Sequence, residues 1–275
     1  SDFEEGYAVA KDIQHVANKR FVAYEDVAIL YRTNAQSRVL EESLRKSGIP
    51  YKIYGGLSFY QRKEIKDVIA YLRLIINPSD EEALKRVINY PARGIGDTTQ
   101  QKLLKVVHEN PRVPALEIIA DPLKYGVDVK GAAAGKLQKF AELINSFLDE
   151  NEQQDAYHVA ERVVFASGIM ADVSVDTSVE NLSRKENIQE FLNAVHEFCD
   201  QKVNNGDNDI RLVNFLNEVS LLTDQDTEKP EDKNTVTLMT VHAAKGLEFA
   251  YIYIVGMEEN LFPSMMVESE RDLEE

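Results

Sequence analysis

The sequence predicts an α/β fold in which an incomplete parallel-sheet domain is interrupted by a large all-helical insertion. Apolar runs of strand length stand near both ends of the 275-residue chain, at 26–31, 51–54, 235–239 and 251–255. Between about residues 60 and 222, nearly every periodic segment has helical spacing instead. Strands that alternate with helices favour a parallel sheet, and a helical stretch between two strand-bearing parts is typical of an insertion.

The N-terminal part alternates helix and strand. Residues 2–19 carry Val9, Ile13 and Val16 at the spacing of one helical face. The run DVAILY at 26–31 predicts a strand, and the helix SRVLEESLRKSG after it ends at Gly48. The short run YKIY follows as a second strand. This β-α-β order implies that the two strands lie parallel. The strand-bearing parts at the two ends of the chain each contain too few strands for a full sheet.

The middle of the chain predicts seven helices. Their sequences are KEIKDVIAYLRLIIN, EEALKRVIN, TTQQKLLKVVHE, KLQKFAELINSFLDE, AYHVAERVVFAS, NIQEFLNAVHEFCDQKV and IRLVNFLNEVSLL. After the acidic stretch DQDTEKPEDKN at 224–234, strands return. We therefore expect residues 1–59 and 233–275 to form the two parts of the sheet domain, and residues 60–232 to form the insertion.

Composition limits the classes of protein. No apolar run reaches membrane-spanning length, and the N-terminus lacks a signal-peptide pattern. The single cysteine, Cys199, excludes an internal disulfide and fits a reducing cytoplasm. Because Cys199 continues an apolar helical stripe, we predict that it is buried. The net charge of −16 argues against binding nucleic acid through overall charge, so any DNA contact must be local.

Two basic islands depart from this acidic average. Residues 32–66 have a net charge of +5 from eight basic side chains (Arg32, Arg38, Arg45, Lys46, Lys52, Arg62, Lys63, Lys66) and three acidic ones. Residues 84–112 have a net charge of +4 from six basic side chains (Lys85, Arg86, Arg93, Lys102, Lys105, Arg112) and two acidic ones. The islands indicate either a phosphate-bearing partner or solvated helix faces.

Catalytic motifs are scarce. The five histidines lack metal-ligand spacing (His15, His108, His158, His196, His242). The phosphate-loop pattern G-x-x-x-x-G-K-[ST] does not occur, so this chain by itself is expected to be inactive as a nucleotide hydrolase. We predict no catalytic residue and no metal ligand within it.

The segment LYRTNAQSR at 30–38 leaves a predicted strand. Ligands of open α/β sheets bind at the carboxyl ends of strands. The polar side chains of Arg32, Asn34, Gln36 and Arg38 therefore stand where a ligand is expected. The alternative is a helix start that is capped by Asn34 or Ser37.

The segment NYPARGIGDTTQQKLL at 89–104 has the order helix, Gly-Ile-Gly, helix, which is typical of half a helix-hairpin-helix. Glycines let the backbone approach a phosphate closely, and the first N–H groups of the next helix face that phosphate. Such a loop binds the DNA backbone without reading sequence. The alternative is an ordinary turn between two helices.

The segment TVHAAKGLEF at 240–249 follows a predicted strand. It is not a phosphate loop, because its glycine follows the lysine. Thr240 and His242 offer a hydroxyl and an imidazole to a sugar-phosphate backbone, Lys245 and Gly246 open a turn, and Glu248 offers a carboxylate to a ribose.

Four stretches together closely resemble superfamily 1 DNA helicases of the UvrD/Rep/PcrA group, and the PcrA branch is the nearest. They are RTNAQSR, IPYKIYGGLSFYQRKEIKDVIAYLRLIINPSD, ARGIGD and VTLMTVHAAKGLEF, and the likeness spans nearly the whole chain. In that family two RecA-like domains enclose an ATP cleft, and each carries a helical insertion. The resemblance implies most of the second RecA-like domain (1–59 and 233–275) with its insertion (60–232), truncated before the family's arginine-bearing motif.

The resemblance also implies roles for individual residues. Glu248 matches the glutamate that contacts the nucleotide ribose. The residues matched to single-stranded DNA are Asn34, Thr240, His242, Arg32 and Lys245, with Arg32 and Arg38 open between phosphate binding and a structural role. The residues matched to a duplex-binding loop are Gly94, Ile95, Gly96, Thr98, Thr99 and Lys102.

The activity implied is ATP-dependent 3′ to 5′ unwinding of DNA in repair or replication, in the bacterial cytoplasm. The implied cofactors are ATP and Mg²⁺, with the metal ligands outside this chain. The implied partners are single-stranded and duplex DNA, the N-terminal half of the same helicase, and repair, replication or transcription proteins, without a membrane. Two other classes remain open: a DNA-binding or interaction module without a motor, and part of a helicase-nuclease.

Overall fold

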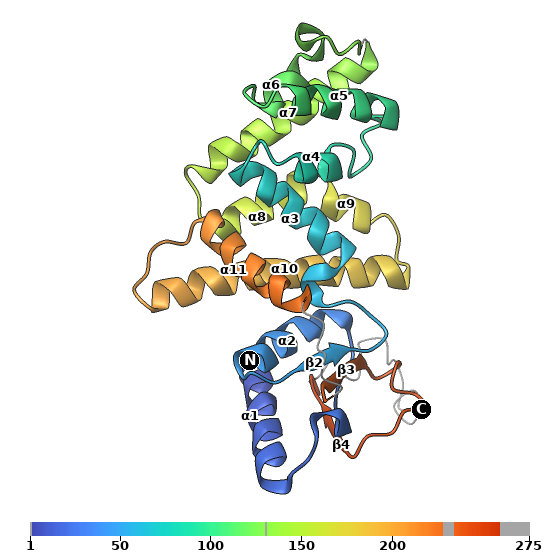
Figure 1. Ribbon diagram of the computed structural model, residues 1–275, viewed down its shortest axis with the longest axis vertical. Helices are drawn as coiled ribbons and strands as arrows, with labels where there is room; N and C mark the ends of the chain where they lie inside the picture. The colour runs from blue at the N-terminus through green and yellow to red at the C-terminus, as the bar shows by residue number, and fades with distance from the viewer. Residues whose placement is uncertain (1, 130, 228–233, 259–275) are drawn as a thin grey trace. The chain divides into compact units, whose positions relative to one another are not determined.

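The structure is a computed structural model that describes residues 2–129, 131–227 and 234–258 (Figure 1). The chain divides into two compact units. The first, called the sheet unit here, comprises Ser1–Arg62 and Gln225–Glu275, and the second, the helical unit, comprises Lys63–Asp224. The α/β class is confirmed, with strands at both ends of the chain and helices between them.

The sheet unit contains a four-stranded, all-parallel sheet with the strand order β2-β3-β1-β4. The strands are β1 (Val27–Tyr31), β2 (Tyr51–Ile53), β3 (Val236–Thr240) and β4 (Tyr251–Ile254). Central β1 pairs with β3 on one side and with β4 on the other. Tyr31 is level with Thr240, so the segments that follow β1 and β3 leave the same edge of the sheet.

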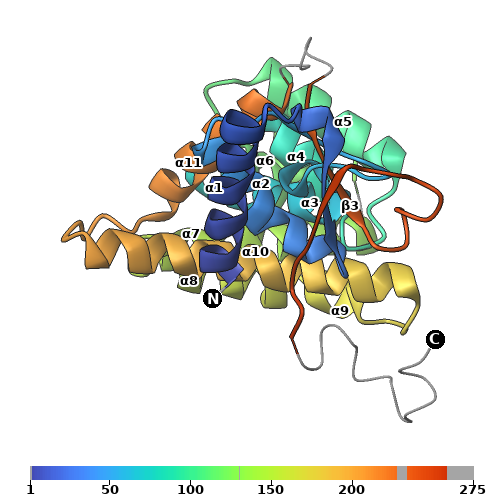
Figure 2. The ribbon, with the colours of Figure 1, turned by 90° about the horizontal axis from the view of Figure 1, so that it is seen from below.

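Helices cover one face of this sheet. Helices α1 (Asp2–Arg20) and α2 (Ser37–Lys46) lie beside each other on one side of the strands (Figures 1 and 2). Apolar side chains of both helices pack with Ile29, Tyr31 and Leu238 of the strands. On the other face, Ala28, Leu30 and Met239 pack against apolar residues of the loop that follows β3. That loop is therefore anchored to the sheet.

A buried polar network joins α2 to the segment around the 3-10 helix η3 (Phe59–Gln61). The Glu41 carboxylate accepts hydrogen bonds from Ser37 Oγ at 2.8 Å and from the Phe59 N–H at 3.1 Å. The Arg62 guanidinium donates to Ser37 Oγ at 2.6 Å and to the Asn34 carbonyl at 2.9 Å. Because Glu41 and Arg62 are both buried, these bonds replace the water that each charge loses.

This network removes three arginines from the exposed charge that was expected of the first basic island. Arg38 is 2% exposed and pairs with Glu42 at 3.2 Å, and Arg62 is buried as described. Arg45 donates to the Tyr51 hydroxyl at 2.6 Å. These three arginines hold the sheet unit together, and a count of charges along the chain could not separate them from exposed ones.

The helical unit confirms the seven predicted helices. They are α3 (Lys63–Ile76), α4 (Glu81–Val87), α5 (Asp97–Glu109), α7 (Ala132–Asn151), α8 (Ala156–Ala166), α10 (Val179–Asn204) and α11 (Leu212–Thr227). The short elements α6 (Ala115–Ala120), η4 (Pro122–Tyr125) and α9 (Ile169–Val173) were not predicted, because six residues or fewer carry too little periodicity. In the sheet unit, η1 (Tyr24–Asp26) and η2 (Asn34–Gln36) are likewise short.

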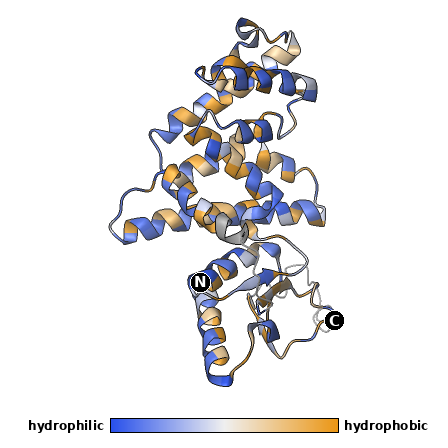
Figure 3. Ribbon diagram, viewed as in Figure 1, coloured by the Kyte–Doolittle hydropathy of each residue, from blue (hydrophilic) through white to orange (hydrophobic). Residues whose placement is uncertain are grey.

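Local chemistry explains where several helices begin. The side chains of Asp80, Asp155 and Ser178 accept hydrogen bonds from the first turns of α4, α8 and α10. Polar and apolar bands alternate along the helices of this unit (Figure 3). Cys199 of α10 is buried as predicted, and burial raises the pKa of its thiol. No helix within the described ranges is long and apolar enough to cross a membrane.

We expect Glu41→Ala to lower the free energy of unfolding of the sheet unit by about 3 kcal/mol, because the Phe59 N–H and buried Arg62 lose a charged neighbour. Urea unfolding followed by circular dichroism would measure it. The matched control is Glu25→Ala, an exposed carboxylate in the same unit. Equal effects of the two substitutions would show that the network adds little stability.

Candidate nucleic-acid interface

The carboxyl edge of the sheet brings together two side chains that are 210 residues apart in the sequence. Arg32 follows β1 and His242 follows β3, and Arg32 Nη1 lies 3.1 Å from His242 Nδ1. A guanidinium can only donate hydrogen bonds, so Nδ1 must accept, and the proton of the neutral ring is then on Nε2. The contact therefore leaves the Nε2–H of exposed His242 as a donor toward solvent.

The turn between β1 and α2 is built by Gln36. Its Oε1 accepts hydrogen bonds from the N–H groups of Arg32 and Thr33, both at 2.9 Å. Thr33 completes a capping box with Gln36, so the cap of this turn is Thr33, and not Asn34 or Ser37 as in the alternative interpretation of this segment. Asn34 is exposed, and its carbonyl accepts from Arg62.

The two arginines of this segment separate in the structure. Arg38 is buried with Glu42, so its role is structural and it cannot reach a phosphate. Arg32 is only half-buried at the carboxyl edge of the sheet. The question that the sequence left open is thus decided for Arg38 by burial.

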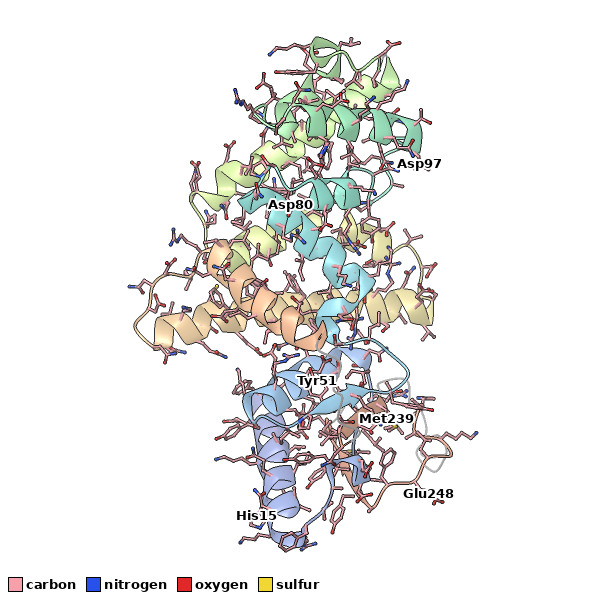
Figure 4. All side chains as sticks on the ribbon, viewed as in Figure 1. His15, Tyr51, Asp80, Asp97, Met239 and Glu248 are labelled. Atoms are coloured by element: carbon pink, nitrogen blue, oxygen red, sulfur yellow. The ribbon has the colours of Figure 1, made fainter. Side chains whose placement is uncertain are left out.

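The loop from Thr240 to Phe249 is shaped by contacts within the loop. Thr240 Oγ1 accepts a hydrogen bond from the Ala243 N–H at 3.2 Å, and Gly246 has a φ of +85°, which suits glycine. Phe249 packs against the sheet, whereas Lys245 and Glu248 are exposed. Figure 4 labels Glu248 on this loop. Neither charged side chain has a hydrogen-bond or ion-pair partner among the described residues, so both can meet a ligand.

The second candidate region lies in the helical unit, where Asn89 holds the loop before α5. Asn89 Oδ1 accepts hydrogen bonds from the N–H groups of Arg93 and Ile95, both at 3.0 Å. The Ile95 side chain is 0% exposed, and its carbonyl accepts from Gln100 at 2.8 Å. Ile95 therefore anchors the loop from inside, and its contact with duplex DNA stays a prediction.

Arg93 fastens the same loop to neighbouring helices. Its guanidinium donates to the carbonyls of Val87, Pro91 and Ser167 and to the Tyr71 hydroxyl, at 2.7–3.1 Å. Burial raises the pKa of Tyr71 to about 12, so its hydroxyl stays protonated even where an ordinary tyrosine would titrate. Sequence reasoning counted Arg93 as a surface charge and missed Asn89, because no spacing rule marks either as a loop support.

The two glycines of the loop differ. Gly94 has a φ of +68°, whereas Gly96 has a φ of −67° and stands at the N-cap of α5. A Cβ on Gly96 would meet open space, and a Cβ on Gly94 would lie 2.6 Å from Lys136 Nζ. Only Gly94 thus has a backbone conformation that favours glycine, and the contact of both glycines with duplex DNA stays a prediction.

Exposed donors gather at the start of α5. Within the described ranges, the N–H groups of Gly96, Asp97 and Thr98 have no hydrogen-bond partner. Thr98 and Lys102 are exposed and stand four residues apart on one helical face, with half-buried Thr99 beside them. Asp97 lies at the outer side of the unit (Figure 4). Of the residues that the sequence matched to duplex DNA, all except Ile95 thus lie in one exposed region at the start of α5.

Comparisons with known proteins agree on one family. A family model described as the UvrD-like helicase C-terminal domain matches residues 1–275. The ATP-dependent DNA helicase PcrA of Staphylococcus aureus (strain Mu50) is 38% identical over 272 residues, covering 98% of this chain and 36% of that protein. The ATP-dependent DNA helicase PcrA of Staphylococcus epidermidis is 39% identical over 275 residues, with the same two shares. The chain thus spans little more than a third of the length of these relatives.

We expect Gly94→Ala to lower the free energy of unfolding of the helical unit by about 1–2 kcal/mol, because alanine is strained at positive φ. Gly96→Ala is the matched control and should change it little, since its backbone is ordinary and its surroundings are open. Urea unfolding of both variants would measure the difference. Similar losses would contradict the separate roles of the two glycines.

Proposed function

Because the chain belongs to the UvrD-like helicase C-terminal domain family, we propose that it is the C-terminal half of an ATP-dependent 3′ to 5′ DNA helicase. Residues 1–59 and 233–275 would be the second RecA-like domain, and residues 60–232 its helical inserted subdomain. The observation that carries the proposal is one loop, Thr240–Phe249, which holds both His242 against Arg32 and the exposed carboxylate of Glu248. One segment can then respond to DNA and nucleotide together.

Single-stranded DNA would run along the carboxyl edge of the sheet. The Arg32 guanidinium and the Nε2–H of His242 supply donors for phosphate oxygens, and exposed Lys245 supplies a second cation. Exposed Asn34 would contribute from the turn after β1, and Thr240 would support the loop through its bond to Ala243. These contacts grip the backbone and carry no base specificity.

ATP would bind beside the same loop, with Glu248 accepting hydrogen bonds from the ribose hydroxyls. The phosphate-binding loop and the remaining wall of the cleft would come from the N-terminal half of the helicase. Within the described ranges, no three His, Cys, Asp or Glu side chains are grouped to hold a metal, so these residues do not fit a Mg²⁺ site. We propose that the ligands of Mg²⁺ lie in the N-terminal half.

Unwinding requires a grip on the duplex ahead of the strand track. The exposed N–H groups at the start of α5, with Thr98, Thr99 and Lys102, would bind phosphates of the duplex, and Gly94 would shape their loop. ATP closing the cleft and hydrolysis reopening it would then move the strand while the loop holds the duplex. The proposed setting is DNA repair or replication in the bacterial cytoplasm.

Glu248→Ala in the complete enzyme should weaken nucleotide binding by roughly 10-fold to 100-fold, because a hydrogen bond to a charged group is worth about 1.5–3 kcal/mol. Affinity for single-stranded DNA without nucleotide should hardly change. Fluorescent-nucleotide titration and DNA anisotropy would measure the two affinities, with the exposed Glu25→Ala as control. A collapse of DNA affinity with unchanged nucleotide affinity would overturn the assignment.

Arg32→Ala and His242→Ala should each weaken single-strand binding, and their effects should not add. Since Arg32 holds the His242 ring, we expect a coupling free energy of roughly 0.5–3 kcal/mol in a double-mutant cycle. Anisotropy of a labelled single strand at fixed salt would measure all four proteins. Strict additivity would mean that the two side chains bind DNA independently of their mutual contact.

A further inference from the structure

A lysine from a distant helix reaches the loop before α5. Lys136, in the second turn of α7, donates a hydrogen bond from Nζ to the Gly94 carbonyl at 3.1 Å, across 42 residues of sequence. A Cβ on Gly94 would stand 2.6 Å from this ammonium. Glycine therefore suits this position for two reasons: it adopts the positive φ without strain, and it leaves room for the lysine side chain.

The Lys136 ammonium keeps capacity for a second partner. An ammonium has three N–H donors, and the Gly94 carbonyl takes one of them. The side chain is exposed, and no carboxylate in the described part of the chain forms an ion pair with it. By contrast, Lys105 pairs with Glu109 and Lys124 pairs with Glu117. Such a cation adds local positive charge in a chain with a net charge of −16.

The Lys136 ammonium offsets negative charge in the loop before α5. The loop also carries the Asp97 carboxylate in the first turn of α5, which favours the helix dipole but repels a phosphate. The Gly94 carbonyl also presents a negative dipole end to an incoming anion. Lys136 offsets that dipole and adds a positive charge at Gly94, which precedes the exposed N–H groups of Gly96 and Thr98 in the loop.

We infer that Lys136 is a further phosphate-binding side chain of the duplex grip. Its ammonium, held in place by the Gly94 carbonyl, binds a backbone phosphate of duplex DNA next to the phosphate that meets the start of α5. This inference rests on the duplex-binding role proposed above for the loop. It adds a residue from α7 to a surface that the sequence assigned to residues 94–102 alone.

The test compares four variants of the complete helicase on a duplex with a 3′ single-stranded tail and on a bare single strand. Lys136→Ala removes the cation, Lys136→Arg keeps it, and Lys139→Ala removes an exposed lysine from the same helix. Lys102→Ala tests the proposed loop itself. Anisotropy titrations between 50 and 200 mM salt give the affinity and the salt slope for each DNA.

For Lys136→Ala we expect weaker binding to the tailed duplex and a salt slope shallower by about 1. Raising the salt concentration fourfold weakens the binding of every variant. Without one phosphate contact, this loss of affinity should be smaller by a factor of roughly 3.5. Lys136→Arg and Lys139→Ala should keep the wild-type slope, and single-strand affinity should stay the same in all variants.

The outcomes separate the inference from its premise. If Lys102→Ala makes the tailed-duplex slope shallower and Lys136→Ala does not, the loop binds DNA and the inference about Lys136 is wrong. If neither variant changes binding to the tailed duplex, the proposed duplex role of the loop is wrong. If Lys139→Ala acts as Lys136→Ala does, the effect is general electrostatics and the specific contact is refuted.

Discussion

The parallel pairing of β1 with β3 is the constraint on which the sheet unit depends. It places Tyr31 level with Thr240, and the Val241 N–H donates to the Tyr31 carbonyl at 2.9 Å. Two chain segments from opposite ends of the sequence are thereby forced to leave the sheet at one edge. The contact between Arg32 and His242 follows directly, as does the exposed position of the loop that carries Glu248.

Buried polar side chains hold the turns that such a site needs. Glu41 and Arg62 tie α2 to the segment before α3, and Asn89 with Arg93 ties the loop before α5 to its neighbours. In each case a carboxylate, amide or guanidinium satisfies backbone groups that no helix or strand pairs. The backbone that faces solvent can then keep its N–H groups available to a ligand.

The same arrangement recurs in the two units with different chemistry. In the sheet unit, an arginine fixes a histidine so that its second nitrogen can donate outward. In the helical unit, a carbonyl fixes a lysine so that its other protons can donate outward. In the proposed function, both arrangements would hold a donor in place before a phosphate binds, which would reduce the side-chain entropy that binding costs.

The sequence by itself determined the strands, the long helices, the turn at Gly94 and the polar segments after β1 and β3, because these depend on periodicity and on residues close in the chain. The short helices α6 and α9 lacked that local signal. The tertiary structure alone decided which charges face solvent: it buried Arg38 and Arg62, used Arg93 and Ile95 as anchors, and brought Lys136 to Gly94. Burial of a charge, and contacts between residues 42 or 210 positions apart, depend on tertiary packing. Local sequence patterns do not show which distant residues will be in contact.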